Sequence, residues 1–302
     1  MSFASRVGII NRFISKPDDV VLPVSFWERL KFLISGILYD LILAIGFVIL
    51  LSFLEPLTSD YENLLNQDLY PFWKAIVVMT VLPPLIEETI FRFPLKYKRN
   101  YILRGLAYLF KTDFSGFWKR HLRIIVYLFS SVFGLVHLSN YENVDWIFFV
   151  LAPIITGPQI VAGLIFSFLR LKLGFVWALL GHFLHNFSLI MLSFLAFHNV
   201  ERPLVDDEQV SIETTGIAFE VARESRMVYD SASNGNLLCL EAQNYELQNL
   251  VDHFYPKDSL KVRDNDRLDL KLYSKTDEGY PREALLEVLE EHYTLRKASK
   301  TD

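Results

Sequence analysis

The chain has 302 residues, of which 52% are hydrophobic and 15% aromatic, and its formal net charge is −5. A net charge this small, with no arginine-rich arm or basic stripe, argues against nucleic acid as a partner. Cys239 is the single cysteine, which excludes an internal disulfide and a zinc site built from cysteines. The apolar residues are concentrated before about residue 200, which predicts two parts of different character.

The N-terminal segment, residues 1–32, is predicted to be cytoplasmic. It has no apolar run followed by a small-residue cleavage site, so we expect no secretory signal peptide. Loops rich in Lys and Arg stay in the cytoplasm. The basic residues of this segment are Arg6, Arg12, Lys16, Arg29 and Lys31.

Five apolar stretches approach the ~20 residues that a membrane-spanning helix needs. They are 33–54, 72–93, 122–139, 147–169 and 173–197. Residues 33–198 are therefore predicted to be an all-α polytopic membrane helix bundle with five or six transmembrane helices. We expect a multi-pass integral protein of a bacterial cytoplasmic membrane, with the lipid bilayer as a partner. Five spans would place the C-terminal domain outside the cytoplasm and six would place it inside, and the sequence leaves both open.

Residues 205–302 are predicted to form a small soluble α+β domain of unknown role. Alternating apolar residues in 209–221 and 267–273 are typical of half-buried strands. Three- and four-residue apolar spacing in 244–255 and 281–293 is typical of helices. The domain shows no catalytic constellation, so the hypothesis for it is the binding of a protein partner.

Two adjacent glutamates and an arginine end the second apolar stretch, in PPLIEETIFRFP (83–94). An ionisable side chain in a spanning segment costs ~2.5–3.5 kcal/mol on insertion scales, so it normally faces the bundle interior and marks function. Glu88 and Arg92 are four residues apart on one helical face, so we expect them to pair. Glu87 lies about 100° around the helix from its neighbour. This leaves Glu87 available to activate water as a general base.

Two later stretches repeat the four-residue spacing. FGLVH contains Phe133 and His137, and HFLHN contains His182 and Asn186. His137 is predicted to share the proton of Glu87. His182 and Asn186 share a helical face and are predicted to donate hydrogen bonds to a developing oxyanion.

The sequences EETIFR, FGLVH and HFLHN match in order the motifs EExxxR, FxxxH and HxxxN of the CPBP family of intramembrane glutamic endopeptidases. This family includes type II CAAX prenyl proteases and bacterial proteins linked to bacteriocin processing or self-immunity. The resemblance covers about residues 72–195 and leaves out the C-terminal domain. It implies hydrolysis of a peptide bond in a membrane-associated peptide or protein substrate. The catalytic residues that it implies are Glu87, His137, His182 and Asn186, with Glu88 and Arg92 in support.

The cofactor and the function both have alternatives. Glu87, Glu88, His137 and His182 would make a mixed nitrogen and oxygen site for zinc, but the HExxH motif is absent. We favour hydrolysis without a metal or other cofactor, with a divalent metal such as zinc as the alternative. Two further functions stay open. One is a catalytically silent family member that binds and protects a partner, and the other is an ion-coupled transporter.

Other residues of the apolar stretches give structural predictions. Asp40 is interpreted as a bundle-facing polar contact, and His185, inside the third motif, is left out of the site. Pro83 and Pro84 predict a break in the second stretch, because proline removes a helix hydrogen bond. The helix that carries Glu87 would then start afresh within the membrane.

Overall fold

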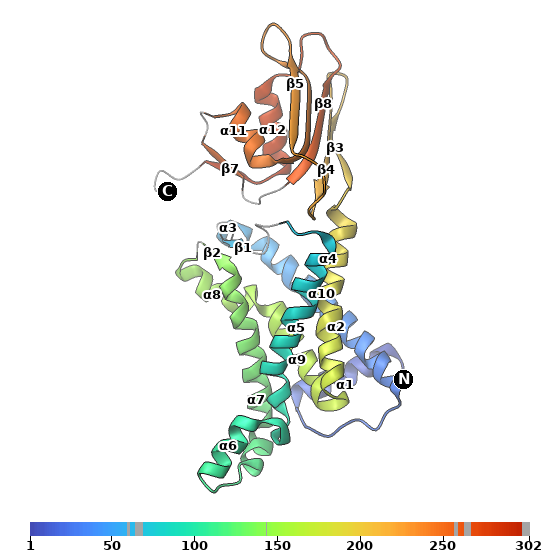
Figure 1. The fold of residues 1–302 in the computed structure, drawn as a ribbon, viewed down its shortest axis with the longest axis vertical. Helices are drawn as coiled ribbons and strands as arrows, with labels where there is room; N and C mark the ends of the chain where they lie inside the picture. Colours follow the sequence, from blue (N-terminus) through green and yellow to red (C-terminus); the bar gives the residue numbers. More distant parts are fainter. Residues whose placement is uncertain (59–60, 64–68, 143, 257–258, 263–266, 298–302) are drawn as a thin grey trace. The chain divides into compact units, whose positions relative to one another are not determined.

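The computed structural model describes residues 1–302 except 59–60, 64–68, 143, 257–258, 263–266 and 298–302 (Figure 1). The described chain divides into two compact units. One unit comprises 1–61 and 75–189, and the other comprises 62–74 and 190–302.

The first unit is helical. Several of its helices start at a residue whose side chain accepts a hydrogen bond from a backbone N–H of the first turn. Ser25 caps α2 and Asp145 caps α8, each accepting a hydrogen bond from a backbone N–H of the first turn. The α-helices up to α10 are α1 Phe3–Ser15, α2 Phe26–Phe53, α3 Glu55–Thr58, α4 Phe72–Ala75, α5 Leu82–Phe91, α6 Tyr101–Leu109, α7 Ser115–Val136, α8 Trp146–Ile155, α9 Gly157–Phe168 and α10 Phe175–Phe197. The shorter segments are the π-helices η2 Ile76–Val81 and η6 Leu169–Leu173, the 3₁₀ turns η3 Phe93–Leu95, η4 Tyr97–Arg99 and η5 His137–Asn140, and the two-residue strands β1 Glu62–Asn63 and β2 Tyr141–Glu142.

Four helical stretches of the described chain are long and apolar enough to cross a membrane. They are Phe26–Phe53, Ser115–Asn140, Trp146–Leu173 and Phe175–Phe197. Large apolar side chains such as Ile42, Ile45 and Val48 are more than half exposed on α2, as expected for a surface that faces lipid. The predicted number of five or six spans is therefore not reached among the described residues. The stretch predicted at 72–93 is not one of the four, because Lys74, Glu87 and Glu88 interrupt its apolar character.

The prolines of that stretch change the type of helix rather than unwinding it. Segments α4, η2 and α5 follow one another without a gap, and Pro83 and Pro84 occupy the first turn of α5. The N–H of Leu82 donates to the carbonyl of Val77, five residues back, as in a π-helix. A proline ring clashes with the carbonyl four residues earlier, and the wider π turn relieves this clash. The predicted break is therefore wrong: the helix that carries Glu87 continues the helical turns before it, with a change from π-helix to α-helix at Leu82.

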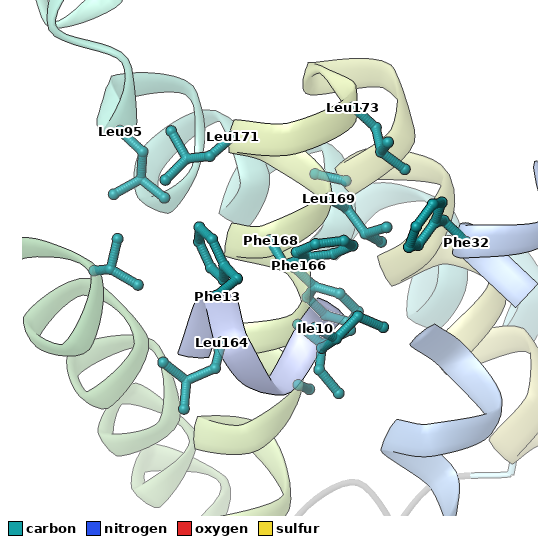
Figure 2. Close-up of a cluster of buried hydrophobic side chains, with 14 of the residues drawn as sticks. Ile10, Phe13, Phe32, Leu95, Leu164, Phe166, Phe168, Leu169, Leu171 and Leu173 are labelled. Atoms are coloured by element: carbon teal, nitrogen blue, oxygen red, sulfur yellow. The ribbon is translucent and has the colours of Figure 1, made fainter. Parts of the chain in front are cut away.

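A buried apolar cluster holds α1, α2 and α9 together. Figure 2 shows Ile10 and Phe13 of α1 beside Phe166 and Phe168 of α9, and all four side chains are at most 2% exposed. The rings of Phe13 and Phe168 meet edge to face with centroids 5.5 Å apart. Part of the N-terminal segment, helix α1, therefore packs in the core of the bundle.

The second unit contains an antiparallel five-stranded sheet in the order β3-β4-β8-β6-β5. Helices α11 Leu247–Phe254 and α12 Arg282–His292 lie on one face of this sheet (Figure 1). The five strands are β3 Glu201–Asp206, β4 Val210–Ile217, β5 Arg226–Ser231, β6 Leu237–Glu246 and β8 Arg267–Ser274, and a separate pair is formed by β7 Leu260–Val262 and β9 Leu295–Lys297. Ile212 pairs with Leu272 and both side chains are fully buried, so the alternation predicted for these two strands fills the core.

Candidate functional site

Helix α5 brings three charged side chains of the first motif into the membrane unit. Arg92 Nη1 lies 3.5 Å from Glu88 Oε1, and both side chains are fully buried. This is the pair expected from the four-residue spacing. The Arg92 guanidinium also lies over the ring of Phe133, 3.9 Å from its centroid, which adds a cation–π contact in place of solvent.

His182 of α10 lies between the two glutamates. Its Nδ1 is 3.1 Å from Glu88 Oε1, and its Nε2 is 3.5 Å from Glu87 Oε2. The ring of Phe166 stacks on the imidazole with centroids 4.8 Å apart and holds it in this orientation. Two carboxylates and one guanidinium leave one surplus negative charge in this cluster.

The two glutamates differ in access. The Glu87 side chain is 26% exposed, whereas that of Glu88 is completely buried. A base that accepts a proton from water must be reached by water, so Glu87 is the carboxylate of this pair that is suited to general-base chemistry. Glu88 is suited to holding Arg92 and His182 in place.

His137 lies at the end of the helix that carries the second motif. Its Nδ1 is 2.8 Å from the carbonyl oxygen of Phe133, which only accepts hydrogen bonds, so Nδ1 carries the proton. In the neutral imidazole, Nε2 is then an acceptor. In the described part of the chain, His137 forms no hydrogen bond or ion pair with Glu87. The Phe133 ring lies edge to face with both His137 and His182, with centroids 5.0 and 5.6 Å apart.

Asn186 has a backbone partner. Its Nδ2 donates to the carbonyl oxygen of Met79 at 2.8 Å, and Met79 belongs to the π-helical segment before α5. The amide nitrogen carries two hydrogens, so one N–H remains for another acceptor. The oxyanion role expected for Asn186 stays a prediction and rests on that second N–H.

Two further interactions around the site were not predicted as such from the sequence. Arg170, which is buried, donates from Nε to the carbonyl of Arg92 at 2.9 Å and from Nη2 to that of Phe93 at 3.0 Å, so it caps the end of α5. His185 Nδ1 lies 2.5 Å from Asp40 Oδ2, and both side chains are buried. This pair connects α2 with α10 and gives Asp40 the bundle-facing contact that was expected for it.

Gly163 of α9 allows the close packing around Arg92. A Cβ at this position would lie 2.9 Å from Arg92 Nη2 and 3.2 Å from the Cα of Ser130. The backbone of α7 cannot move by the required amount without loss of packing. Gly163→Ala is therefore expected to destabilise the protein by about 1–3 kcal/mol, as overpacking does.

Thermal unfolding in detergent measures this effect, with Gly46→Ala as the control. A Cβ on Gly46, within α2, meets nothing within 4 Å. This control is expected to leave stability unchanged or to raise it by about 0.5–1 kcal/mol, because alanine favours helix. Equal stability of the two variants would contradict the packing argument.

The four candidate metal ligands do not assemble into one donor set. Among the described residues, no group of three or more histidine, cysteine, aspartate or glutamate side chains is arranged to hold a metal ion. His182 lies 3.1 Å from Glu88 Oε1 and 3.5 Å from Glu87 Oε2, whereas His137 is hydrogen-bonded to its own helix. The arrangement of these four side chains therefore does not fit a zinc ion.

The C-terminal unit contains a cavity of about 510 Å³ on the polar face of its sheet. Charged side chains that line it pair with one another, with Arg223 2.9 Å from Asp269 and Lys271 2.9 Å from Glu213.

Comparison with known proteins identifies the membrane part of the chain. No curated protein and no solved structure matches the chain. Residues 69–188 match the family model "Rce1-like: Type II CAAX prenyl endopeptidase Rce1-like". The matched range includes all three motifs and the cluster around Glu88 and His182. Residues 69–188 are therefore an Rce1-like type II CAAX prenyl endopeptidase domain in a membrane protein.

Proposed function

We propose that the protein is an intramembrane endopeptidase that hydrolyses a peptide bond of a membrane-associated peptide or protein, with Glu87 as the general base. The observation that carries this proposal is the partly exposed Glu87 beside His182, while the fully buried Glu88, itself paired with Arg92, contacts the other nitrogen of the same imidazole. The family match supports a protease in general terms.

In this proposal, Glu87 takes one proton from a water molecule as the water oxygen attacks the scissile carbonyl carbon. His182, 3.5 Å from Glu87 Oε2, orients the carboxylate and shares the proton that Glu87 has accepted from water. Collapse of the tetrahedral intermediate breaks the C–N bond, and the proton held by Glu87 passes to the leaving amine. The second proton of the water passes from the new carboxylic acid to the amine, so the products are a carboxylate and an ammonium group and the step needs no further reactant.

Donors for the oxyanion come from α10. The second N–H of Asn186 and a protonated His182 are the donors that we propose from the third motif. His137 offers Nε2 as an acceptor that would assist proton transfer once substrate and water bind near Glu87.

The membrane setting suits a substrate anchored in the bilayer. We propose that the N-terminus lies in the cytoplasm of a bacterial cell, because basic residues lie in the N-terminal segment and between α5 and α7. The C-terminal unit is proposed to bind a protein partner.

Cleavage of a membrane peptide by the purified protein tests the proposal. We expect the protein in lipid vesicles to cleave a fluorogenic CAAX peptide, with faster turnover of the farnesylated form than of the same peptide without the lipid. Activity should persist in the presence of EDTA, since the donor set does not fit a metal. Tight binding without cleavage would favour the silent partner-binding function, and loss of activity on chelation with recovery on addition of zinc would contradict the metal-free mechanism.

A further inference from the structure

The carbonyl of Met79 has no backbone donor within its own helix. In an α-helix, the carbonyl of residue 79 accepts from the N–H of residue 83, and in a π-helix from that of residue 84. Both positions are proline, which has no N–H. In the interior of a membrane protein, water is not available to satisfy a free carbonyl, so its partner must come from another part of the chain.

Asn186 is that partner. Its Nδ2 lies 2.8 Å from the Met79 oxygen, and the two residues are 107 positions apart in the sequence. Asn186 follows His182 by one helical turn on the same face of α10. The hydrogen bond therefore connects the helix that carries His182 to the segment that leads into the helix of Glu87.

A second link joins the same two elements. His182 Nδ1 lies 3.1 Å from Glu88 Oε1, so α10 is attached to the stretch before α5 through Asn186 and to α5 itself through His182. Two attachments fix both the sliding and the rotation of one helix against the other. With only the His182 attachment, α10 would be free to rotate about that contact and to change the distance from His182 to Glu87.

We infer that Asn186 is a positioning residue: it occupies the hydrogen-bond gap that Pro83 and Pro84 open at Met79, and thereby sets His182 against Glu87 and Glu88. The activity part of this inference rests on the proposed function, whereas the structural part does not. An amide that acted on the substrate alone would not depend on the prolines. The two roles therefore predict different outcomes when a backbone N–H is returned to the helix.

The test is a double-mutant cycle between Asn186→Ala and Pro83→Ala. Alanine at position 83 supplies the N–H that donates to Met79 once the π-helical turn closes to an α-helical one, so it should compensate for the loss of the Asn186 amide. We expect Asn186→Ala to lower Tm and to reduce kcat about tenfold to hundredfold with little change in KM, because misplacement of catalytic groups by about 1 Å has effects of this size. The double variant should recover most of the loss in Tm and the part of the loss in kcat that misplacement of His182 causes, whereas the loss of the second Asn186 N–H as an oxyanion donor would remain.

Pro153→Ala is the matched control, because Pro153 lies inside α8 and its replacement also adds an N–H to a membrane helix. It should not rescue Asn186→Ala. Equal rescue of Tm by Pro153→Ala, or a stable Pro83→Ala single variant combined with a double variant whose Tm is as low as that of Asn186→Ala, would overturn the inference. Asn186→Ser, which keeps a shorter donor, gives a milder version of the same cycle if Asn186→Ala does not fold.

Amide hydrogen exchange separates this inference from the proposed function. Asn186→Ala should speed exchange in residues 76–91, and Pro83→Ala should restore protection. If no preparation cleaves any peptide, the proposed function fails. The hydrogen exchange and Tm of Asn186→Ala, Pro83→Ala and the double variant still decide the inference. Unchanged exchange in Asn186→Ala would overturn it whether or not the protein is a protease.

Discussion

Glu87→Gln is expected to abolish peptide cleavage, with kcat reduced by about 10²–10⁴-fold, the contribution typical of a positioned general base. Glutamine has nearly the same shape but cannot accept a proton from water at neutral pH. The Glu87 side chain is partly exposed, and a glutamine of nearly the same shape can keep its place 3.5 Å from His182. The replacement should therefore leave the fold and KM nearly unchanged. The measurement is kcat and KM on a fluorogenic membrane peptide, together with Tm.

The matched control is Glu28→Gln, which removes the same charge from a similarly exposed position, 24% against 26%, at the start of α2 and outside the site. Its activity should stay near that of the unmodified protein, because surface ion pairs contribute at most about 1 kcal/mol. Full activity of Glu87→Gln would refute a role for this carboxylate in activating water. A large loss of Tm in the same variant would instead assign Glu87 to structure.

Local spacing predicted the parts of the site that lie on one helix. Glu88 and Arg92 are four residues apart, so their pairing follows from helix geometry alone, and the structure places them 3.5 Å apart. The same reasoning predicted that Glu87 would point elsewhere, and its exposed fraction of 26% agrees with that direction. The family motifs then supplied the order of the three helices, and the family model covers the same region.

Contacts between distant segments could not be predicted in this way. Spacing along one helix contains no information on which imidazole approaches Glu87, and the nearer one is His182 rather than the expected His137. Arg170 lies 78 positions from Arg92, and its basic side chain had been counted only as evidence for a cytoplasmic turn. The Asn186 contact was equally hidden, although the two prolines already indicated a carbonyl in need of a donor.

Secondary structure was missed where the pattern of apolar residues is interrupted. Strand β6 lies next to β8 in the sheet, but its register shifts between Ala242 and Tyr245, so the alternation of apolar residues is lost there. Asn244, within this irregular part, has a positive φ of 47°. The predicted helix at 244–255 therefore began too early, and α11 begins at Leu247. A bulge is set by pairing with other strands, which a local pattern does not contain.

The buried charge of Arg92 predicts the largest loss of stability. Glu88→Gln keeps an oxygen that accepts from His182 but removes the negative charge 3.5 Å from the guanidinium. Arg92 is fully buried, and none of its guanidinium nitrogens has a hydrogen-bond partner among the described residues. Removing one partner of a buried pair leaves an uncompensated charge, so Glu88→Gln is expected to cost about 3–5 kcal/mol.

Combining Glu88→Gln with Arg92→Met should recover most of this loss, because a buried ion pair and a neutral pair of similar volume have similar stability. The flexible Met side chain also fits against the rings of Phe133 and Phe166, which now face the guanidinium. Reversible unfolding in detergent measures the free energies of the two single variants and the double variant. Strictly additive losses would contradict the pairing of Glu88 with Arg92.

Lys31→Met provides the surface comparison for this cycle. Lys31 pairs with Glu28 at 3.1 Å, but its side chain is 54% exposed. Its loss should cost less than about 1 kcal/mol, because water solvates either partner when the pair is broken.

The double variant Glu88→Gln/Arg92→Met should lose most or all of its peptide cleavage although its stability is restored. The reason is that His182 then lacks the charged partner that holds it beside Glu87. Stability and activity would thus separate in one protein, which distinguishes the burial of a charge from its use in positioning the imidazole.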